Sequence, residues 1–325
     1  MSLSGQQVLV TGATGFLGGA LALRLVADGA QVRALARSPK KAESLRERGI
    51  EVSRGDITDP DAVRRAVESC KVVFHVAAAM EGDYTKQESV NVGGTRKLLQ
   101  AATEAGVERF VHVSSAAVYG YNISGDITEA APPAPGADPY AVTKTAAERE
   151  VLEGNVPFTM IRPGMIYGAG SINWTGAFFR WGRMKPVLFP GRGQGSAFPI
   201  HVEDVVDLLV VAAEHPAATG QIFNCAPDPA PTWREFISAY SRLAGHQSWL
   251  SIPMQPLYPL AKLAQILSPP QSMARDFPDL LRFAERRITY KMTKARDLLG
   301  WSPLYDLERG VASCAPWLRE RGLLR

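Results

Sequence analysis

A glycine-rich turn near the start of the chain constrains the fold more than any other feature. Gly12, Gly15 and Gly18 recur at every third position and directly follow the short apolar run Val8–Val10. Residues Leu17–Asp28 then carry the apolar periodicity of a helix. A strand, a sharp turn that needs glycine and a helix together form the opening of a βαβ unit. The sequence therefore predicts a parallel sheet that begins at the N-terminus.

The first half of the chain continues to alternate short β-branched runs with helical stretches. This alternation is typical of a parallel sheet covered by helices on both faces. The expected strands are Val8–Val10, Gln31–Ala36, Val72–Val76, Phe110–Val113 and Phe158–Ile161, and the expected helices are Leu17–Asp28, Asp61–Glu68 and Gly94–Ala105. We therefore expect an α/β fold, a Rossmann-type doubly wound parallel sheet.

The character of the sequence changes after Gly164, where Pro, Gly and aromatic residues become frequent. We expect mostly loops from Ile172 to Pro199, a strand at Gln221–Asn224 that returns to the sheet, and helices at Thr232–Gly245 and from Leu257 onward. A chain of 325 residues fits about two domains. The expected division is a Rossmann domain in residues 1–165, its sheet completed by 196–225, and a smaller, mostly helical lobe in residues 166–325.

The glycine-rich turn is also a candidate binding site for a dinucleotide. Glycine lets the backbone approach a pyrophosphate, and the following helix N-terminus offers unpaired N–H groups and a positive dipole end. After the second strand, Ala36 stands where NAD enzymes usually place an acidic residue, and Arg37 follows it. A guanidinium can bind a 2′-phosphate through two parallel hydrogen bonds, whereas a plain surface charge is the alternative role for Arg37. We therefore expect NADP (NADPH) as the cofactor, with NAD possible.

The stretch from Asp138 to Lys144 is the strongest candidate for catalysis. Asp138 can cap a helix and Pro139 suits its first position, so Tyr140 and Lys144 should lie one turn apart on the same face. A phenol has a pKa near 10, and a neighbouring ammonium lowers it by stabilising the phenolate. Tyr140 is therefore the expected acid/base, and Lys144 the residue that tunes it and holds the nicotinamide ribose.

Ser115 comes just after the strand expected at Phe110–Val113, at the carboxyl edge of the sheet where ligands bind in open α/β folds. Its hydroxyl can orient a substrate carbonyl or alcohol while Tyr140 transfers the proton. Ser114 is the competing hydroxyl. A tyrosine and a lysine four residues apart are common by chance, but their combination with a dinucleotide turn and a serine at a strand end is specific.

Several short motifs spread over nearly the whole chain support the same interpretation. They are TGATGFLG at residues 11–18, GDITDP at 55–60, HVAA at 75–78, NVGGT at 91–95, VSSAAVYG at 113–120, RPGMIYG at 162–168, HVEDVV at 201–206 and TKARDLLGWSP at 293–303. Together with the tyrosine–lysine pair they resemble the extended short-chain dehydrogenase/reductase family, also called the epimerase/dehydratase family.

The resemblance implies a set of residues around a bound cofactor. It has Asp56 and Ile57 beside the adenine, Asn91 supporting a cofactor-side helix and Pro163 near the nicotinamide. The full expected set is Gly12, Thr14, Gly15, Phe16, Leu17, Gly18, Arg37, Asp56, Ile57, Ala77, Ala78, Asn91, Tyr140, Lys144 and Pro163, with Ser115, Tyr140 and Lys144 catalytic.

The resemblance is closest to the hydroxysteroid dehydrogenase and dihydroflavonol reductase branch. Arg162-Pro163-Gly164 and the VRALARS stretch at residues 32–38 are similar to that branch. Sugar-nucleotide epimerases usually have an asparagine-containing stretch where this chain has Arg162-Pro163-Gly164. Ala116 and Ala117 also stand where sugar dehydratases have an Asp-Glu pair, which argues against dehydration.

The aromatic residues after the cofactor domain are candidates for the walls of a substrate pocket or for core positions. They are Trp174, Phe178, Phe179, Trp181 and Phe189. As walls they would suit an apolar or aromatic ketone or alcohol. Arg180, Arg183 and Arg192 lie among them and could either hold a substrate diphosphate or face solvent.

Three functions follow from these alternatives. The first is reversible hydride transfer between NADPH and a ketone or secondary alcohol of an apolar small molecule bound in the 166–325 lobe. The second is a nucleotide-sugar 4-epimerase that uses bound cofactor. The third is a dinucleotide-sensing regulator without turnover, against which an intact Ser115, Tyr140 and Lys144 set argues.

Composition excludes several other classes. A net charge of +4 is small for this length and does not indicate nucleic-acid binding. Cys70, Cys225 and Cys314 form no paired motif, so no metal site and no disulfide are expected, and a reducing cytoplasm fits best. The apolar segment Leu257–Leu267 is too short to span a bilayer and is expected as a lid or core helix, with a membrane-touching helix as the alternative. The family resemblance implies a homodimer formed through the helix at Arg96–Ala105 and the helix that begins at Tyr140.

Overall fold

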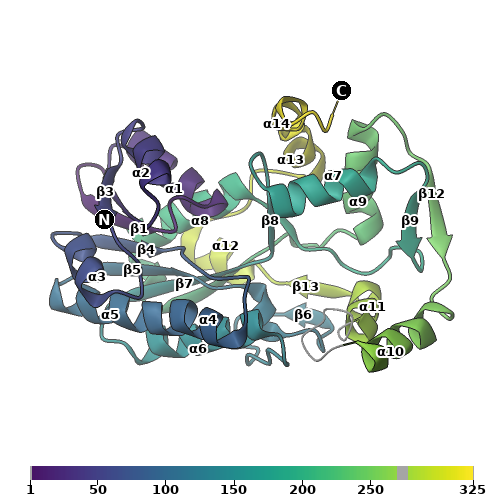
Figure 1. The fold of residues 1–325 in the computed structure, drawn as a ribbon, viewed down its shortest axis with the longest axis horizontal. Helices are drawn as coiled ribbons and strands as arrows, with labels where there is room; N and C mark the ends of the chain where they lie inside the picture. The colour runs from purple at the N-terminus through teal and green to yellow at the C-terminus, as the bar shows by residue number, and fades with distance from the viewer. Residues whose placement is uncertain (1, 269–276, 325) are drawn as a thin grey trace.

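The computed structural model describes residues 2–268 and 277–324, and its central element is a parallel sheet (Figure 1). Within the described residues the sheet has seven strands in the order β11–β7–β5–β4–β1–β2–β3. The strands are β1 Gln7–Thr11, β2 Gln31–Ala36, β3 Glu51–Arg54, β4 Val72–His75, β5 Arg109–Val113, β7 Phe158–Pro163 and β11 Gln221–Cys225. The order reverses between β1 and β4, which is the arrangement of a doubly wound fold. The predicted α/β fold class is confirmed.

Helices cover both faces of this sheet (Figure 1). One face carries α1 Phe16–Ala27, α2 Pro39–Arg46 and α8 Val202–Glu214, and the other carries α3 Pro60–Val67, α5 Gly94–Glu104 and α6 Pro139–Glu153. Val8 and Val10 of β1 belong to the core on the first face, whereas Leu9 belongs to the core on the second. Burial on both faces explains why the strand sequences are apolar at consecutive positions.

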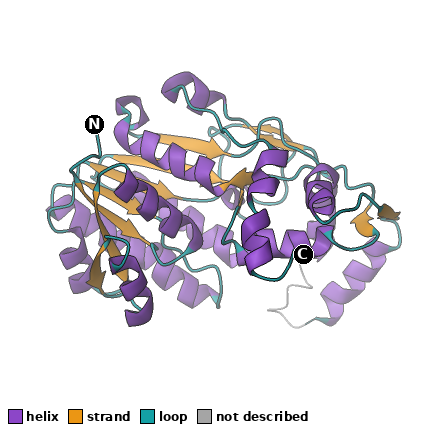
Figure 2. Cartoon of the chain, turned by 90° about the horizontal axis from the view of Figure 1, so that it is seen from above, coloured by secondary structure: helices purple, strands orange, loops and turns teal. Residues whose placement is uncertain are grey.

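The chain after β7 builds a second group of elements beyond one end of the sheet (Figures 1 and 2). In the described part of the chain, three short parallel strand pairs lie outside the main sheet: β8 Met165–Tyr167 with β10 Pro199–His201, β9 Val187–Pro190 with β12 Trp249–Ile252, and β13 Ile288–Tyr290 with the earlier β6 Gly125–Ile127. Helix α12 Thr293–Leu299 packs back on the main sheet beside β11, whereas the helices of this part are α7 Ala177–Gly182, α9 Trp233–Leu243, α10 Leu257–Leu267, α11 Phe277–Glu285, α13 Leu307–Ser313 and α14 Ala315–Glu320. Phe178, Phe179, Phe236 and Tyr240 form the centre of its own core.

Short helical segments complete the structure. They are α4 Tyr84–Glu88, the π-helical turns η1 Ser89–Gly93 and η3 Ile172–Gly176, and the 3₁₀ turns η2 Ala116–Tyr119 and η4 Pro216–Ala218. Within residues 2–268 and 277–324, no helix has both the length and the apolar character needed to cross a bilayer.

Three sequence predictions about secondary structure need correction. The segment 172–199, expected as loops, contains η3, α7 and β9, because its aromatic side chains pack into the second core. The edge strand β3 and helix α2 were not predicted, because both are short and rich in charged residues. Helix α10, expected as a lid or core helix, is not a core helix, since Ala261 is the one residue of it that is fully buried.

Candidate functional site

A cleft of about 1190 Å³ runs along the carboxyl edge of the sheet. It is lined by the residues that follow β1, β2, β3, β4, β5 and β7, which is where ligands bind in open α/β folds. The predicted site residues that line it are Gly12, Thr14, Gly15, Phe16, Leu17, Gly18, Arg37, Asp56, Ile57, Ala77, Ala78, Ser115, Tyr140, Lys144 and Pro163. The structure thus brings together every predicted site residue except Asn91.

The glycine-rich turn fits a dinucleotide. Gly12 has a φ of +74°, and a Cβ there would lie 2.8 Å from the backbone nitrogen of Ala77, so only glycine is tolerated. A Cβ at Gly18 would overlap the carbonyl oxygen of Gly12. Gly15 caps α1 without a side chain, which leaves the first N–H groups of this helix without a side-chain acceptor at the wall of the cleft. Free N–H groups at a helix N-terminus are a site for a pyrophosphate.

Arg37 lies beside the adenine end expected for the cofactor. Its Nη1 donates to Asp56 Oδ2 at 3.2 Å, and its side chain is 74% exposed. Partial burial raises the pKa of Asp56, but hydrogen bonds from Thr58 and the Arg37 guanidinium outweigh this and hold the pKa below its usual value. Asp56 therefore stays ionised and keeps Arg37 at the mouth of the cleft, with further donors free to bind an anion.

Asn91 is buried behind the cleft and joins two parts of the site. Its side-chain oxygen accepts from the backbone N–H of Ala79 at 2.7 Å, and its amide donates to the Ala79 carbonyl at 2.9 Å. The same amide donates to Thr143 Oγ1 at 3.0 Å on α6. The loop after β4 is thereby fixed against the helix that carries Tyr140 and Lys144.

Ser115, Tyr140 and Lys144 meet at the centre of the cleft. Asp138 caps α6 by accepting from the Tyr140 backbone N–H at 3.1 Å, and Pro139 begins the helix, as the sequence predicts. Tyr140 forms a side-chain hydrogen bond with Ser115. Lys144, four residues later on the same face, is buried and donates from Nζ to the Val113 carbonyl at 2.6 Å.

The expected acidification of Tyr140 is not produced by the chain alone. Burial raises the pKa of Tyr140 to about 12, and the Asp138 carboxylate raises it further, whereas the Ser115 hydrogen bond lowers it. Burial likewise lowers the pKa of Lys144 to about 8, with the Glu148 carboxylate opposing this shift. A neighbouring ammonium lowers the pKa of a phenol, but the loss of solvent around both groups disfavours each charged form. Tyr140 therefore carries its proton at neutral pH.

A buried polar network behind Ser115 was not predicted. Glu148 on α6 and Arg162 on β7 pair through two hydrogen bonds, Nε to Oε1 at 2.8 Å and Nη2 to Oε2 at 2.7 Å. Ser114 Oγ donates to Glu148 Oε1 at 2.6 Å, and Arg162 Nη1 donates to Tyr119 Oη at 2.9 Å. The available signals were an arginine inside an apolar strand and a glutamate four residues after Lys144 on the same helical face. The competing residue Ser114 also borders the cleft, but its hydroxyl donates to this network.

The second group of elements supplies the other end of the cleft. Three of the five predicted aromatic candidates, Trp174, Trp181 and Phe189, line it, whereas Phe178 and Phe179 are core residues. The remaining lining side chains from this part are mostly apolar and were not predicted: Met165, Ile166, Ile172, Pro190, Phe198, Trp233, Leu280, Phe283, Ala284 and Tyr290, with the polar Ser171 and Asn173 among them and Tyr121 and Met80 from the first half of the chain. Arg180, Arg183 and Arg192 are exposed and do not line the cleft.

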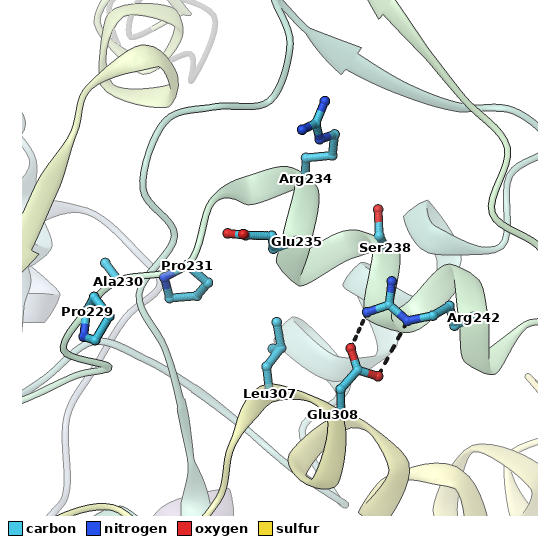
Figure 3. A pocket seen from close by; sticks show the side chains of 9 residues that line it. All are labelled: Pro229, Ala230, Pro231, Arg234, Glu235, Ser238, Arg242, Leu307 and Glu308. Atoms are coloured by element: carbon cyan, nitrogen blue, oxygen red, sulfur yellow. Dashed lines mark hydrogen bonds and ion pairs between the residues drawn. The ribbon is translucent and has the colours of Figure 1, made fainter.

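A second hollow of about 590 Å³ lies on the outer face between α9 and α13 (Figure 3). It is open, and one wall is the ion pair between Arg242 and Glu308, drawn in Figure 3. Glu235 is occupied in capping α9 through Thr232. None of the predicted site residues lines this hollow. The cleft at the sheet edge is therefore the candidate active site.

Comparison with known proteins agrees with the geometry of this cleft. The model of the NAD-dependent epimerase/dehydratase family matches residues 8–226, more than half of the chain. A 3β-hydroxysteroid dehydrogenase/Δ5→4-isomerase of Mycobacterium tuberculosis is 30% identical, over 96% of this chain and 90% of that protein. A UDP-glucose 4-epimerase of Mycolicibacterium smegmatis is 30% identical, over 97% of this chain and 99% of that protein.

Two further similarities extend over nearly the full length. A 4-hydroxy-2-methyl-3-oxo-4-farnesyl-3,4-dihydroquinoline-1-oxide ketoreductase of Stigmatella aurantiaca is 29% identical, over 94% of each chain. The crystal structure of gox2253 superposes with a TM-score of 0.81 at 26% identity and covers 98% of this chain and all of that one. The family match, these enzymes and the dinucleotide cleft agree: the chain belongs to the NAD-dependent epimerase/dehydratase family and is an NAD(P)-dependent oxidoreductase of the extended short-chain dehydrogenase/reductase type.

Proposed function

We propose that the protein is an NADP-preferring reductase of a ketone group on an apolar small molecule, and that it also catalyses the reverse oxidation of the secondary alcohol. One observation carries this substrate class. Among the described residues that line the cleft, no charged side chain comes from any position after Lys144. The substrate end of the cleft is therefore apolar and aromatic, which favours a substrate held by burial of apolar surface.

The proposed chemistry uses three side chains. A reduced nicotinamide bound in the cleft would supply the hydride to the carbonyl carbon. Ser115 donates a hydrogen bond to the carbonyl oxygen and holds it beside Tyr140. Tyr140 then transfers its phenolic proton to that oxygen, which completes the alcohol. Lys144 holds the nicotinamide ribose and supports the phenolate that remains after the transfer.

The protonation of Tyr140 favours the reductive direction. Its pKa is raised to about 12 by burial, so the phenol is a proton donor throughout the neutral range. Carbonyl reduction needs a donor at this position, whereas alcohol oxidation needs a base. Arg37, with its guanidinium at the mouth of the cleft, is the proposed ligand of a 2′-phosphate and the source of the NADP preference. The remaining cofactor contacts proposed are those predicted from the sequence.

A nucleotide-sugar 4-epimerase is the second candidate, because a UDP-glucose 4-epimerase is among the relatives. This function needs groups that hold a substrate diphosphate. Arg180, Arg183 and Arg192, the candidates for that role, lie outside the cleft. We therefore rank it below carbonyl reduction. The regulator without turnover is not carried forward, since the relatives are enzymes.

The test is NADPH consumption with a panel of apolar ketones, run beside thermal shift with UDP- and TDP-sugars. The proposal expects turnover of at least one ketone and no stabilisation by the sugars. Stabilisation by a sugar nucleotide without ketone turnover would favour the epimerase and contradict the proposal.

We propose that residues 1–165, completed by 196–225, bind the cofactor, and that residues 166–325 form the substrate lobe. We also propose a homodimer through the exposed sides of α5 and α6, which pack side by side on one face of the sheet and are joined by the ion pair of Arg96 and Glu150 at 2.6 Å. Light scattering of the purified chain tests the dimer.

A further inference from the structure

Helix α10 presents its apolar face to the outside. Leu260, Leu263, Ile266 and Leu267 are 61%, 52%, 75% and 73% exposed, whereas Ala261 is buried. Residues three and four apart lie on one face of a helix, so these four side chains form one continuous stripe. Single exposed leucines are ordinary on a protein surface, but a contiguous apolar stripe marks an interaction site.

The neighbouring strands extend this apolar region. Trp249 and Leu250 of β12 are exposed, and Leu250 pairs in register with the exposed Leu188 of β9. Figure 1 shows β9, β12, α10 and α11 together at the end of the molecule away from the main sheet. We call the outward side of α10, β12 and β9 the α10 surface. Helix α10 packs on α11, whose Leu280 is exposed and lines the cleft, so this surface adjoins the substrate end of the site.

The charge around the α10 surface is mostly basic. The chain has 32 acidic residues in 325, yet none occurs between Glu153 and Glu203 or between Glu235 and Asp276. The first stretch includes α7 and β9, and the second includes β12 and α10. The exposed charges they carry are basic: Arg180, Arg183 and Lys185 beside β9, and Lys262 on α10. Helix α11, which packs on α10, adds the exposed acids Asp279 and Glu285 as well as the exposed Arg282, and the exposed Arg287 follows it. Exposed basic residues therefore outnumber acidic ones around the apolar stripe, which makes it complementary to an anionic lipid interface.

We propose that the α10 surface docks the protein on an anionic lipid surface, with α10 lying in the plane of the interface. The leucine and isoleucine side chains insert at the boundary between headgroups and acyl chains, and the lysine and arginine side chains bind lipid phosphates. Eleven residues are too few to cross a bilayer, so the helix lies on it. Docked in this way, the protein could take up an apolar substrate from the lipid through the side of the cleft formed by α11. This consequence rests on the proposed function.

The test is flotation of the full chain with mixed phosphatidylglycerol–phosphatidylcholine vesicles, compared with phosphatidylcholine vesicles alone. The double variant L263E/I266E places charges in the stripe. The variant L304E is its matched control, because Leu304 is 68% exposed but lies between α12 and α13. We expect the wild type and L304E to float with the anionic vesicles. The affinity of the double variant for these vesicles should be at least about tenfold lower. Added salt should weaken the binding of the wild type.

Two results would overturn the proposal. One is a wild-type chain that stays unbound with both lipid compositions. The other is a loss of binding in L304E equal to that in the double variant. If vesicles do not bind and L263E/I266E converts a wild-type dimer to monomer, a second copy of the chain covers the surface and the lipid proposal is wrong. Flotation needs no turnover, and the thermal unfolding midpoint checks that the variants fold, so this result is separate from the test of reductase activity.

Discussion

Replacing Glu148 with glutamine is expected to lower the free energy of unfolding by about 3–5 kcal/mol, the cost of leaving one buried charge without its partner. The side chains of Arg162 and Glu148 are 3% and 2% exposed, so water cannot replace either partner. Glutamine keeps the volume of Glu148 and one oxygen acceptor, but it leaves the Arg162 guanidinium without a counter-charge. Ser114 also loses the carboxylate to which it donates.

The assay is urea unfolding followed by circular dichroism, with the slope compared between variants to check that the transition is the same. Glu43→Gln on α2 is the control at an exposed ion pair. Glu43 pairs with Arg46, their side chains are 65% and 45% exposed, and solvent screens such a pair. We expect the control to lose less than about 1 kcal/mol.

A second variant keeps this prediction testable if E148Q has too little stability to fold, since the total free energy of unfolding of a protein is about 5–15 kcal/mol. The double variant E148L/R162M removes both charges together, and apolar pairs of similar volume commonly replace buried ion pairs without loss. It should therefore recover most of the lost stability. An E148Q protein within about 1 kcal/mol of the wild type, or a double variant less stable than the single one, would refute the reasoning.

Three further predictions concern the cleft. Substituting Arg37 with alanine should raise the KM for NADPH about 10- to 100-fold through the loss of a charge-assisted hydrogen bond, with the KM for NADH unchanged. The control R46A on α2 should alter neither KM. An equal effect on both cofactors would exclude Arg37 as the 2′-phosphate ligand. Substituting Gly18 with alanine should cost about 1–3 kcal/mol of stability and weaken NADPH binding, since a Cβ there overlaps the backbone of the turn. Alanine at Gly93, where a Cβ would meet nothing closer than 3.7 Å, should be tolerated, and equal losses in the two variants would contradict the steric argument. For pH, burial lowers the pKa of Lys144 to about 8, so this group loses its charge as pH rises through that value. The kcat/KM for ketone reduction, which reports the free enzyme, should therefore fall above about pH 8; activity constant up to about pH 10 would show that the charge of Lys144 is not needed.

The sequence was sufficient for the main sheet because its strands are buried on both faces. Their near-continuous apolar runs, such as Val72–His75 and Arg109–Val113, lie between helices with clear periodicity. The edge strand Glu51–Arg54 has no such run, because it contacts the sheet on one side only and carries charged residues at both ends. Local pattern cannot identify a strand whose pairing is set by a distant neighbour.

The sequence predicted the site correctly at positions where only one residue type meets the structural requirement. Glycine at positions 12 and 18 is required by the close approach of backbone, and that requirement is visible in the spacing. Burial of a side chain is not visible in the same way. Nothing in the sequence around Tyr140 shows that its surroundings raise its pKa, and nothing in the order of Arg180, Arg183 and Arg192 shows that they face away from the cleft.

The central claim is that the phenol of Tyr140 delivers the proton in carbonyl reduction, and the variant Tyr140→Phe tests it most directly. Burial of the ring and the helix cap at Asp138 are kept, so NADPH binding, measured by quenching of protein fluorescence, should change little. The kcat for ketone reduction should fall by about 10²- to 10⁴-fold, the usual contribution of a positioned proton donor. A variant that binds NADPH and reduces the ketone at the wild-type rate would contradict the mechanism.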